Sequence, residues 1–202
     1  MTTPRRRADP ASFTDPENWS GGYYELYLEF GARDDAVLGR AARALTRVAG
    51  IDGWYPDRHR DPAGQTPREP EAVALDEPGD LAGTVVVPGG HRVVCRLIPY
   101  RADGPLGADH LGLCLPLGAL HRTDRRIGGF PFGPDGDERS LAWRTTLDEW
   151  LAGLGRAVFA EVPFTSAVIG FELDADVTPD NQAWNAYLLP TAGGLHHVPV
   201  VR

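Results

Sequence analysis

The segment YYELYLEF at residues 23–30 alternates acids and tyrosines with apolar or aromatic residues. Successive side chains of a β-strand point to opposite faces of the sheet, so Tyr23, Glu25, Tyr27 and Glu29 would share one face. Carboxylates beside aromatic rings attract cations, because the carboxylate charge and the electron-rich face of the ring both favour a positive group. The segment therefore predicts a binding site for a small cationic or aromatic ligand. A strand face that is merely solvated is the alternative interpretation.

Two further residues are expected to lie beside this face. In HLGLCLPLGAL, residues 110–120, leucines at alternate positions predict a strand that carries His110 on its other, less apolar face. In FTSAVIGFELD, residues 164–174, Glu172 falls on the face opposite the alternating apolar residues. The predicted ligand-binding residues are Tyr23, Glu25, Tyr27, Glu29, His110 and Glu172.

Motifs for catalysis or metal binding do not occur in the chain. It has no HxxxH, HExxH, CxxC or GxSxG spacing. The adjacent His196 and His197 would point to opposite faces of a strand, which keeps them from binding one metal ion together. We therefore predict no catalytic residue, no metal ligand and no cofactor. An enzyme that pairs Glu25 or Glu29 with His110 or His197 as acid and base is kept as an alternative.

Charge and composition exclude several classes of function. The 20 basic side chains are all Arg, so the chain has no lysine for a Schiff base with pyridoxal phosphate or for a P-loop. A net charge of −8 disfavours nucleic acid as a partner and suits a basic protein. No run is apolar enough to span a bilayer and no secretory signal is visible, so we expect a cytoplasmic protein without a membrane partner. Cys95 and Cys114 are expected to be buried thiols, and a disulfide between them would require neighbouring strands.

Two helices and several strands must position the predicted site. Apolar residues at helical spacing predict a helix that Asp34 or Asp35 caps and Gly50 ends, and a second helix at residues 138–160. Two β-branched runs around Pro88-Gly89-Gly90 predict a hairpin, and a second hairpin is predicted at the end of the chain. The segment 1–20 contains three prolines and is expected to be flexible.

Helices placed between antiparallel strands are typical of the α+β class. We predict a largely antiparallel sheet of about seven strands with the two main helices on one face, because two helices cannot cover both faces of such a sheet. Residues 21–202 would form a single domain behind the flexible segment 1–20. A strand-helix-strand-strand order occurs twice, in candidate halves at 21–101 and 108–202, which suggests a pseudo-duplicated arrangement.

This element order resembles that of the GyrI-like family of effector-binding domains, which are built from two strand-helix-strand-strand halves. The resemblance rests on element order over most of the chain. It implies a cleft between the halves that binds small, often cationic ligands and is lined by acidic and aromatic residues.

Three functions are compatible with these observations. The first is a non-catalytic binding domain that holds a small cationic or aromatic ligand on the open sheet face. The second is an acidic protein-interaction module, of the immunity or antitoxin kind, that binds a basic protein. The third is the enzyme described above. The acids would line a hollow in the first case and would be exposed on a convex surface in the second.

Overall fold

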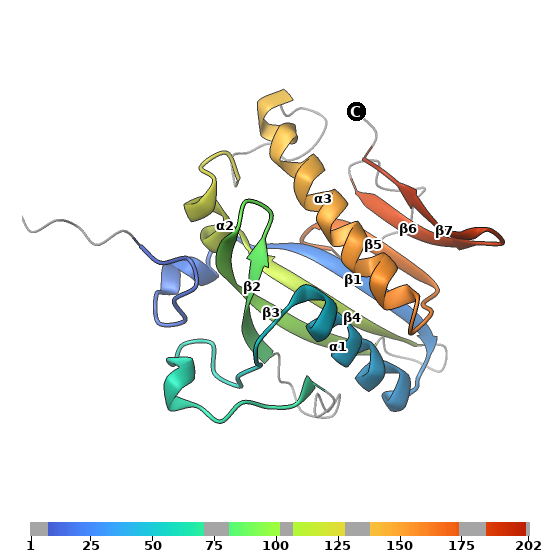
Figure 1. Cartoon of the computed structure of the whole chain (residues 1–202), viewed down its shortest axis with the longest axis horizontal. Helices are drawn as coiled ribbons and strands as arrows, with labels where there is room; N and C mark the ends of the chain where they lie inside the picture. Colours follow the sequence, from blue (N-terminus) through green and yellow to red (C-terminus); the bar gives the residue numbers. More distant parts are fainter. Residues whose placement is uncertain (1–7, 71–80, 102–106, 128–137, 174–184, 201–202) are drawn as a thin grey trace, which may run out of the picture.

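Seven antiparallel strands form one sheet in the order β2-β3-β4-β1-β5-β6-β7 (Figure 1). The computed structural model describes residues 8–70, 81–101, 107–127, 138–173 and 185–200. The strands are β1 (Tyr23–Ala32), β2 (Leu81–Val87), β3 (His91–Arg101), β4 (Ala108–Pro116), β5 (Ser166–Phe171), β6 (Ala186–Thr191) and β7 (Gly194–Val198). The α-helices are α1 (Asp35–Ala49), α2 (Leu117–Thr123) and α3 (Glu138–Phe159), and the short 3₁₀ turns are η1 (Pro16–Trp19) and η2 (Pro62–Gly64).

Helices α1 and α3 contact each other and cover the same face of the sheet (Figure 1). The predicted α+β class with an antiparallel sheet is therefore confirmed. Tyr24, Leu26 and Leu28 of β1 are fully buried in the hydrophobic core beneath these helices. Because side chains alternate along a strand, Tyr23, Glu25, Tyr27 and Glu29 lie on the face that is turned away from α1 and α3.

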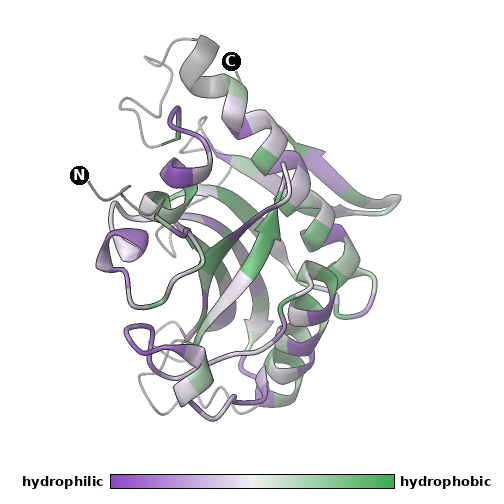
Figure 2. Cartoon of the chain, turned by 60° about the vertical axis from the view of Figure 1, so that its left-hand side comes forward, coloured by the Kyte–Doolittle hydropathy of each residue, from purple (hydrophilic) through white to green (hydrophobic). Residues whose placement is uncertain are grey.

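Helix α1 begins and ends where its sequence predicts. The side chain of Asp34 accepts hydrogen bonds from the backbone N–H groups of Ala36 and Val37, and Gly50 ends the helix in the left-handed conformation at φ 66°. Figure 2 shows hydrophobic and hydrophilic colours along this helix. Its apolar side packs on the sheet, as an amphipathic helix requires.

The strand predicted at residues 110–120 is shorter in the structure, because β4 ends at Pro116 and the next seven residues form α2. Gly118 donates its backbone N–H to the carbonyl of Ser20 at 2.9 Å. A Cβ atom at Gly118 would collide with the carbonyl oxygen of Glu17. This close contact between α2 and η1 is a tertiary effect, which the alternation of leucines could not reveal.

The two predicted halves do not have equivalent positions in the sheet. Strand β3, the second strand after α1, lies next to β4, whereas β5, the first strand after α3, lies next to β1. If the halves were equivalent, β6, the second strand after α3, would lie next to β1, just as β3 lies next to β4. The repeated element order is therefore not accompanied by a symmetric sheet.

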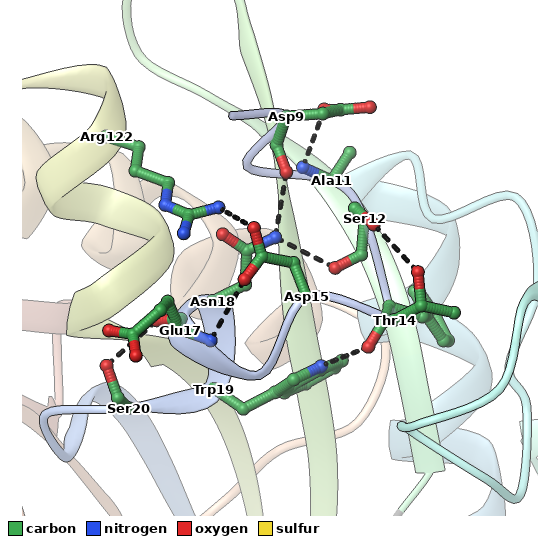
Figure 3. Close-up of polar contacts among 11 residues, drawn as sticks. Asp9, Ala11, Ser12, Thr14, Asp15, Glu17, Asn18, Trp19, Ser20 and Arg122 are labelled. Atoms are coloured by element: carbon green, nitrogen blue, oxygen red, sulfur yellow. Dashed lines mark hydrogen bonds and ion pairs between the residues drawn. The ribbon is translucent and has the colours of Figure 1, made fainter. Parts of the chain in front are cut away.

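The N-terminal segment differs from the flexible segment that its prolines predict. Residues 8–20 are held by two buried side chains, Phe13 and Asn18, which are 2% and 0% exposed. The Asn18 side-chain amide donates hydrogen bonds to the carbonyl oxygens of Asp9 and Ser12, both at 2.8 Å (Figure 3). These bonds satisfy the backbone of a segment that has little regular secondary structure.

Contacts to the rest of the molecule fix this segment in place. The Pro10 carbonyl accepts a hydrogen bond from the backbone N–H of Val94 on β3 at 3.0 Å. The carboxylate of Asp15 pairs with Arg122 of α2 at 2.6 Å (Figure 3), and this contact lowers the pKa of the carboxyl. Phe13 packs edge-on against Trp19, with ring centroids 5.6 Å apart.

The loop that follows α1 extends the sheet at the edge of β2. Tyr55 exchanges two backbone hydrogen bonds with Ala82, at 2.8 and 2.9 Å, so the side chains of these two residues share a face. Trp54 points to the helical side, where its Nε1 donates to the hydroxyl of Thr46 at 2.8 Å. Tyr55 also packs edge-on against Phe13. The N-terminal segment and the loop after α1 therefore together cover the β2 side of the sheet face that is turned away from α1 and α3.

Two glycines of α3 offer a matched test of how closely this helix packs on the sheet. Both lower helix propensity, which predicts a break or a close contact, yet α3 runs through Gly153 and Gly155 without interruption. A Cβ at Gly153 would meet nothing within 4 Å, whereas one at Gly155 would collide with the side chain of buried Leu188.

We expect Gly153→Ala to raise the free energy of unfolding by up to about 1 kcal/mol, through better helix propensity. Gly155→Ala should lower it by about 1–2 kcal/mol, because the added methyl overpacks the core. Urea denaturation of the two variants measures the difference. Equal effects would show that α3 does not press on β6 at Gly155.

Candidate functional site

Strand register brings the acids of β1 beside residues that are far away in the sequence. Glu25 lies directly opposite Cys114 on β4 and Gly170 on β5, and Glu29 lies opposite His110 and Ser166. Directly opposite residues have Cβ atoms about 4.5–5.5 Å apart. Strand β3 adds further side chains to the same face. We call this surface the polar face; its members are Tyr23, Glu25, Tyr27, Glu29, Arg96, Tyr100, His110, Cys114 and Ser166.

Glu25 is a buried carboxyl at the centre of the polar face, with 8% of its surface exposed. Burial raises its pKa, and the hydrogen bond that its Oε2 accepts from the backbone N–H of Leu173 at 2.8 Å opposes this rise. The nearby charges of Glu172 and Arg96 act in opposite directions on this pKa. Among the residues that the structure describes, no basic side chain forms an ion pair with Glu25.

Arginines gather at the end of the polar face where β1 begins. Arg96 donates from Nη1 to the hydroxyl of Tyr23 at 2.6 Å, and its guanidinium lies 5.1 Å from the centre of the tyrosine ring. Arg58, from the loop after α1, approaches the same hydroxyl at 3.4 Å. The hydroxyl of Tyr23 therefore already accepts hydrogen bonds from two guanidinium groups. Sequence reasoning missed these arginines, because only the strand register and the path of the loop bring them to Tyr23.

Aromatic rings and one carboxylate surround His110 at the other end of the polar face. The imidazole stacks on Tyr27, with centroids 5.2 Å apart and planes at 28°, and lies 5.9 Å from the tilted ring of Tyr100. Glu29 accepts a hydrogen bond from the Ser166 hydroxyl through Oε2 at 2.8 Å. Burial lowers the pKa of His110, while the negative charges of Glu29 and Asp109 oppose this effect. The ring is therefore neutral near pH 7.

The charge of Asp109 is already compensated. This residue is 1% exposed and accepts two hydrogen bonds from the Arg101 guanidinium, at 2.5 and 2.8 Å, and one from the backbone N–H of Asp34. Although burial alone would raise its pKa, the Arg101 contact prevails and the pKa of this carboxyl is lowered. Asp109 is therefore an anchor between β3, β4 and the start of α1, which leaves Glu25 and Glu29 as the acids that a ligand could use.

The arrangement does not match a nucleophilic triad. Ser166 donates to the carboxylate of Glu29 rather than to a histidine, so it does not form the Ser–His pair of a nucleophilic triad. His197 pairs with Leu188, a core residue on the helical side of the sheet. The pairing of Glu25 or Glu29 with His197 is therefore corrected, because the sheet separates them. Among the described residues, no three His, Cys, Asp or Glu side chains lie close enough to hold a metal ion.

Glu172 does not extend the polar face as its sequence position predicts. Strand β5 ends at Phe171, and Glu172 adopts the left-handed conformation at φ 43° with an exposed side chain. Its carboxylate lies next to Gly22, at the edge of the face. The turn presents the backbone N–H of Leu173 to Glu25 instead. Of the six predicted site residues, the five from β1 and β4 come together and Glu172 lies at their margin.

The two cysteines are free thiols on opposite faces of the sheet. Cys114 shares the polar face with Glu25, whereas Cys95, one residue before Arg96, points to the helical side. Their strands are neighbours, but side chains on opposite faces cannot form a disulfide. Burial raises the pKa of both thiols, which makes them poor nucleophiles.

A second polar cluster lies under α3 on the helical side, and sequence reasoning missed it. Tyr24 donates its hydroxyl hydrogen bond to Asp148 and accepts one from Arg144 Nε at 3.0 Å. Arg144 and Asp148 are 4% and 6% exposed, and Trp143 packs edge-on against the Tyr24 ring. Burial raises the pKa of Asp148 to about 6. The four-residue spacing of Arg144 and Asp148 places both on one side of α3, and this spacing is the feature of the sequence that could have revealed the cluster.

The chain matches no protein-family model, no curated protein and no solved structure. The resemblance to the GyrI-like family therefore stays a prediction, and the functional argument depends on the geometry of the polar face. None of the helices in the described part of the chain combines the length and apolar character that a membrane span requires.

Proposed function

We propose that the polar face binds a small cationic or aromatic ligand without converting it chemically. The observation that carries this proposal is Glu25, a buried carboxyl whose burial is not offset by an ion pair within the described residues. A buried carboxylate without a counter-ion is costly. A cationic ligand in contact with Glu25 would supply the ion pair and would lower the pKa of this carboxyl on binding.

The aromatic rings near the acids favour a flat or aromatic cation. Tyr27 lies between Glu25 and Glu29 along β1 and is half-buried, and Tyr100, beside His110, is 42% exposed. Rings at such positions can contact an aromatic ligand, and they add cation–π attraction worth about 0.5–2 kcal/mol. Acidic and aromatic groups of β1, β4 and β3 therefore lie near one another on the polar face.

Burial of the acids favours a small ligand over a basic protein. An acidic interaction module would expose its carboxylates, so that arginines and lysines of a partner could reach them. Glu25 is 8% exposed and Glu29 is half-buried. Carboxylates at such positions are less accessible to the side chains of a partner protein than exposed ones, which is why the protein-interaction hypothesis ranks second.

Glu25→Gln tests the proposed function. The variant keeps an acceptor for the Leu173 N–H and removes the charge, so we expect it to fold and to bind phenyltrimethylammonium about tenfold or more weakly, since contacts to a charged group are worth about 1.5–3 kcal/mol. Isothermal titration calorimetry measures the dissociation constants. Glu149→Gln, an exposed position on α3, makes the same change of charge and should bind like the wild type. The absence of saturable binding by any organic cation would contradict the proposed function.

A further inference from the structure

The Nδ1 atom of His110 is an unusual feature of the polar face. His110 is 5% exposed, and its Nδ1 is buried without a hydrogen-bond partner among the described residues. Buried polar atoms are nearly always hydrogen-bonded, and one that is not costs free energy. An atom of this kind within a cluster of aromatic and acidic side chains points to a partner that the described part of the chain does not provide.

A second acceptor belongs to the residue that lies opposite His110 in the sheet. Glu29 is directly opposite His110 in the strand register, and its Oε2 is occupied by the Ser166 hydroxyl. Its Oε1 accepts no hydrogen bond from the part of the chain that the structure describes. The charge of Asp109 is satisfied by Arg101, so Glu29 is the carboxylate available to a ligand at this end of the polar face.

The protonation of His110 decides which ligand groups fit. Its lowered pKa makes the ring neutral near pH 7, and a neutral imidazole has one N–H donor and one lone-pair acceptor. With the proton on Nε2, Nδ1 is an acceptor. A ligand would then meet two neighbouring acceptors, Nδ1 of His110 and Oε1 of Glu29, and one negative charge.

Tyr100 of β3 lies opposite His110, with its ring 5.9 Å from the imidazole. Its ring is tilted at 45° to the imidazole, and it is one of the two large apolar side chains that are exposed in the described residues. An exposed side chain near the end of a strand changes rotamer readily. A ligand could therefore displace the ring from His110 and stack in its place without disturbing the core.

We propose that His110 and Glu29 select planar cations that carry N–H donors, such as amidinium or guanidinium groups, over quaternary ammonium ions of equal charge. This inference rests on the proposed function of the polar face and specifies its ligand class. An amidinium presents two N–H groups on one edge, which match the two acceptors, and a flat surface, which matches Tyr27. A quaternary ammonium ion supplies the charge and the cation–π contact but no hydrogen-bond donor.

Two probes with one positive charge and one phenyl ring test the selection. We expect benzamidinium to bind about tenfold more tightly than phenyltrimethylammonium, the fold-change that one hydrogen bond contributes at the upper end of its usual range. His110→Phe keeps a flat ring and removes Nδ1, so the two probes should bind it with affinities within about twofold of each other. His110→Asn places an acceptor near the position of Nδ1 and should retain much of the preference.

A measurement on the wild type makes the test independent of variant folding. In protein with ¹⁵N-labelled histidine, benzamidinium should shift the Nδ1 resonance of His110 and phenyltrimethylammonium should leave it nearly unchanged. Equal affinities for both probes, or a preference that survives in His110→Phe, would overturn the inference while leaving the proposed function intact. Failure of both probes to bind would overturn the inference together with the proposed function.

Discussion

Replacing Phe13 with alanine should lower the free energy of unfolding by about 3–5 kcal/mol, the usual cost of truncating a buried phenylalanine. Phe13 is 2% exposed and packs edge-on against Trp19 and Tyr55. It thus joins the N-terminal segment to the loop that extends β2. Denaturation in urea measures the change. Hydrogen exchange at the backbone N–H of Asn18, which donates to the backbone carbonyl of Asp15, shows whether the segment has detached.

Tyr100→Ala provides the matched control for this experiment. It also removes an aromatic ring, but that ring is 42% exposed, so we expect a loss below about 1.5 kcal/mol, the upper value of a single ring–ring contact. If Phe13→Ala cost no more than this control, residues 8–20 would be only loosely attached, as their prolines alone suggest. A large loss would instead establish that the segment is an integral part of the core.

Asp148→Asn should change how stability depends on pH. The folded state raises the pKa of this carboxyl from 3.8 to about 6, so the folded state binds a proton more tightly than the unfolded state does. This contribution to stability is fully present below pH 4 and is lost as the pH rises through 6. Relative to wild type, the neutral variant should therefore gain about 2.4 kcal/mol between pH 4 and pH 7, because each tenfold difference in proton affinity between the two states corresponds to about 1.4 kcal/mol and a small part of the effect is already lost at pH 4.

The test uses the pH dependence of the difference between the two proteins. A constant offset reflects altered contacts to Tyr24 and Arg144, and all other carboxyls cancel because both proteins share them. Denaturation at several pH values between 4 and 8 gives the difference directly. Glu69→Gln, at an exposed loop position, should show no such trend. A difference for Asp148→Asn that stays flat would mean that the Tyr24–Asp148–Arg144 cluster keeps the carboxyl ionised.

Local patterns in the chain account for much of the fold. Asp34 and Gly50 bound α1 as predicted, because capping depends on residues within one turn of the helix end. The turn at Gly89 and Gly90, both at positive φ, joins β2 to β3 as the hairpin motif predicts. The alternation in YYELYLEF correctly separates buried Leu26 and Leu28 from the polar face.

Predictions failed where distant contacts override local preference. Residues from Leu117 onward form a helix because α2 packs on η1, although their alternation with β4 predicts a strand. The N-terminal segment is fixed by Phe13 and Asn18, whose partners lie on other parts of the chain or depend on its path. Glu172 leaves the polar face because the strand ends one residue before it.

The sequence by itself determined which side chains of β1 share a face, since the two-residue period of a strand is a local property. It also determined that no lysine chemistry is available. Only the tertiary structure decided that His110 lies opposite Glu29, that Arg96 holds Tyr23, and that His197 is on the far side of the sheet. Register between strands depends on the packing of the whole sheet against its helices, and no single segment encodes it. The burial that leaves Glu25 without an ion pair and Nδ1 of His110 without a partner in the described residues has the same origin.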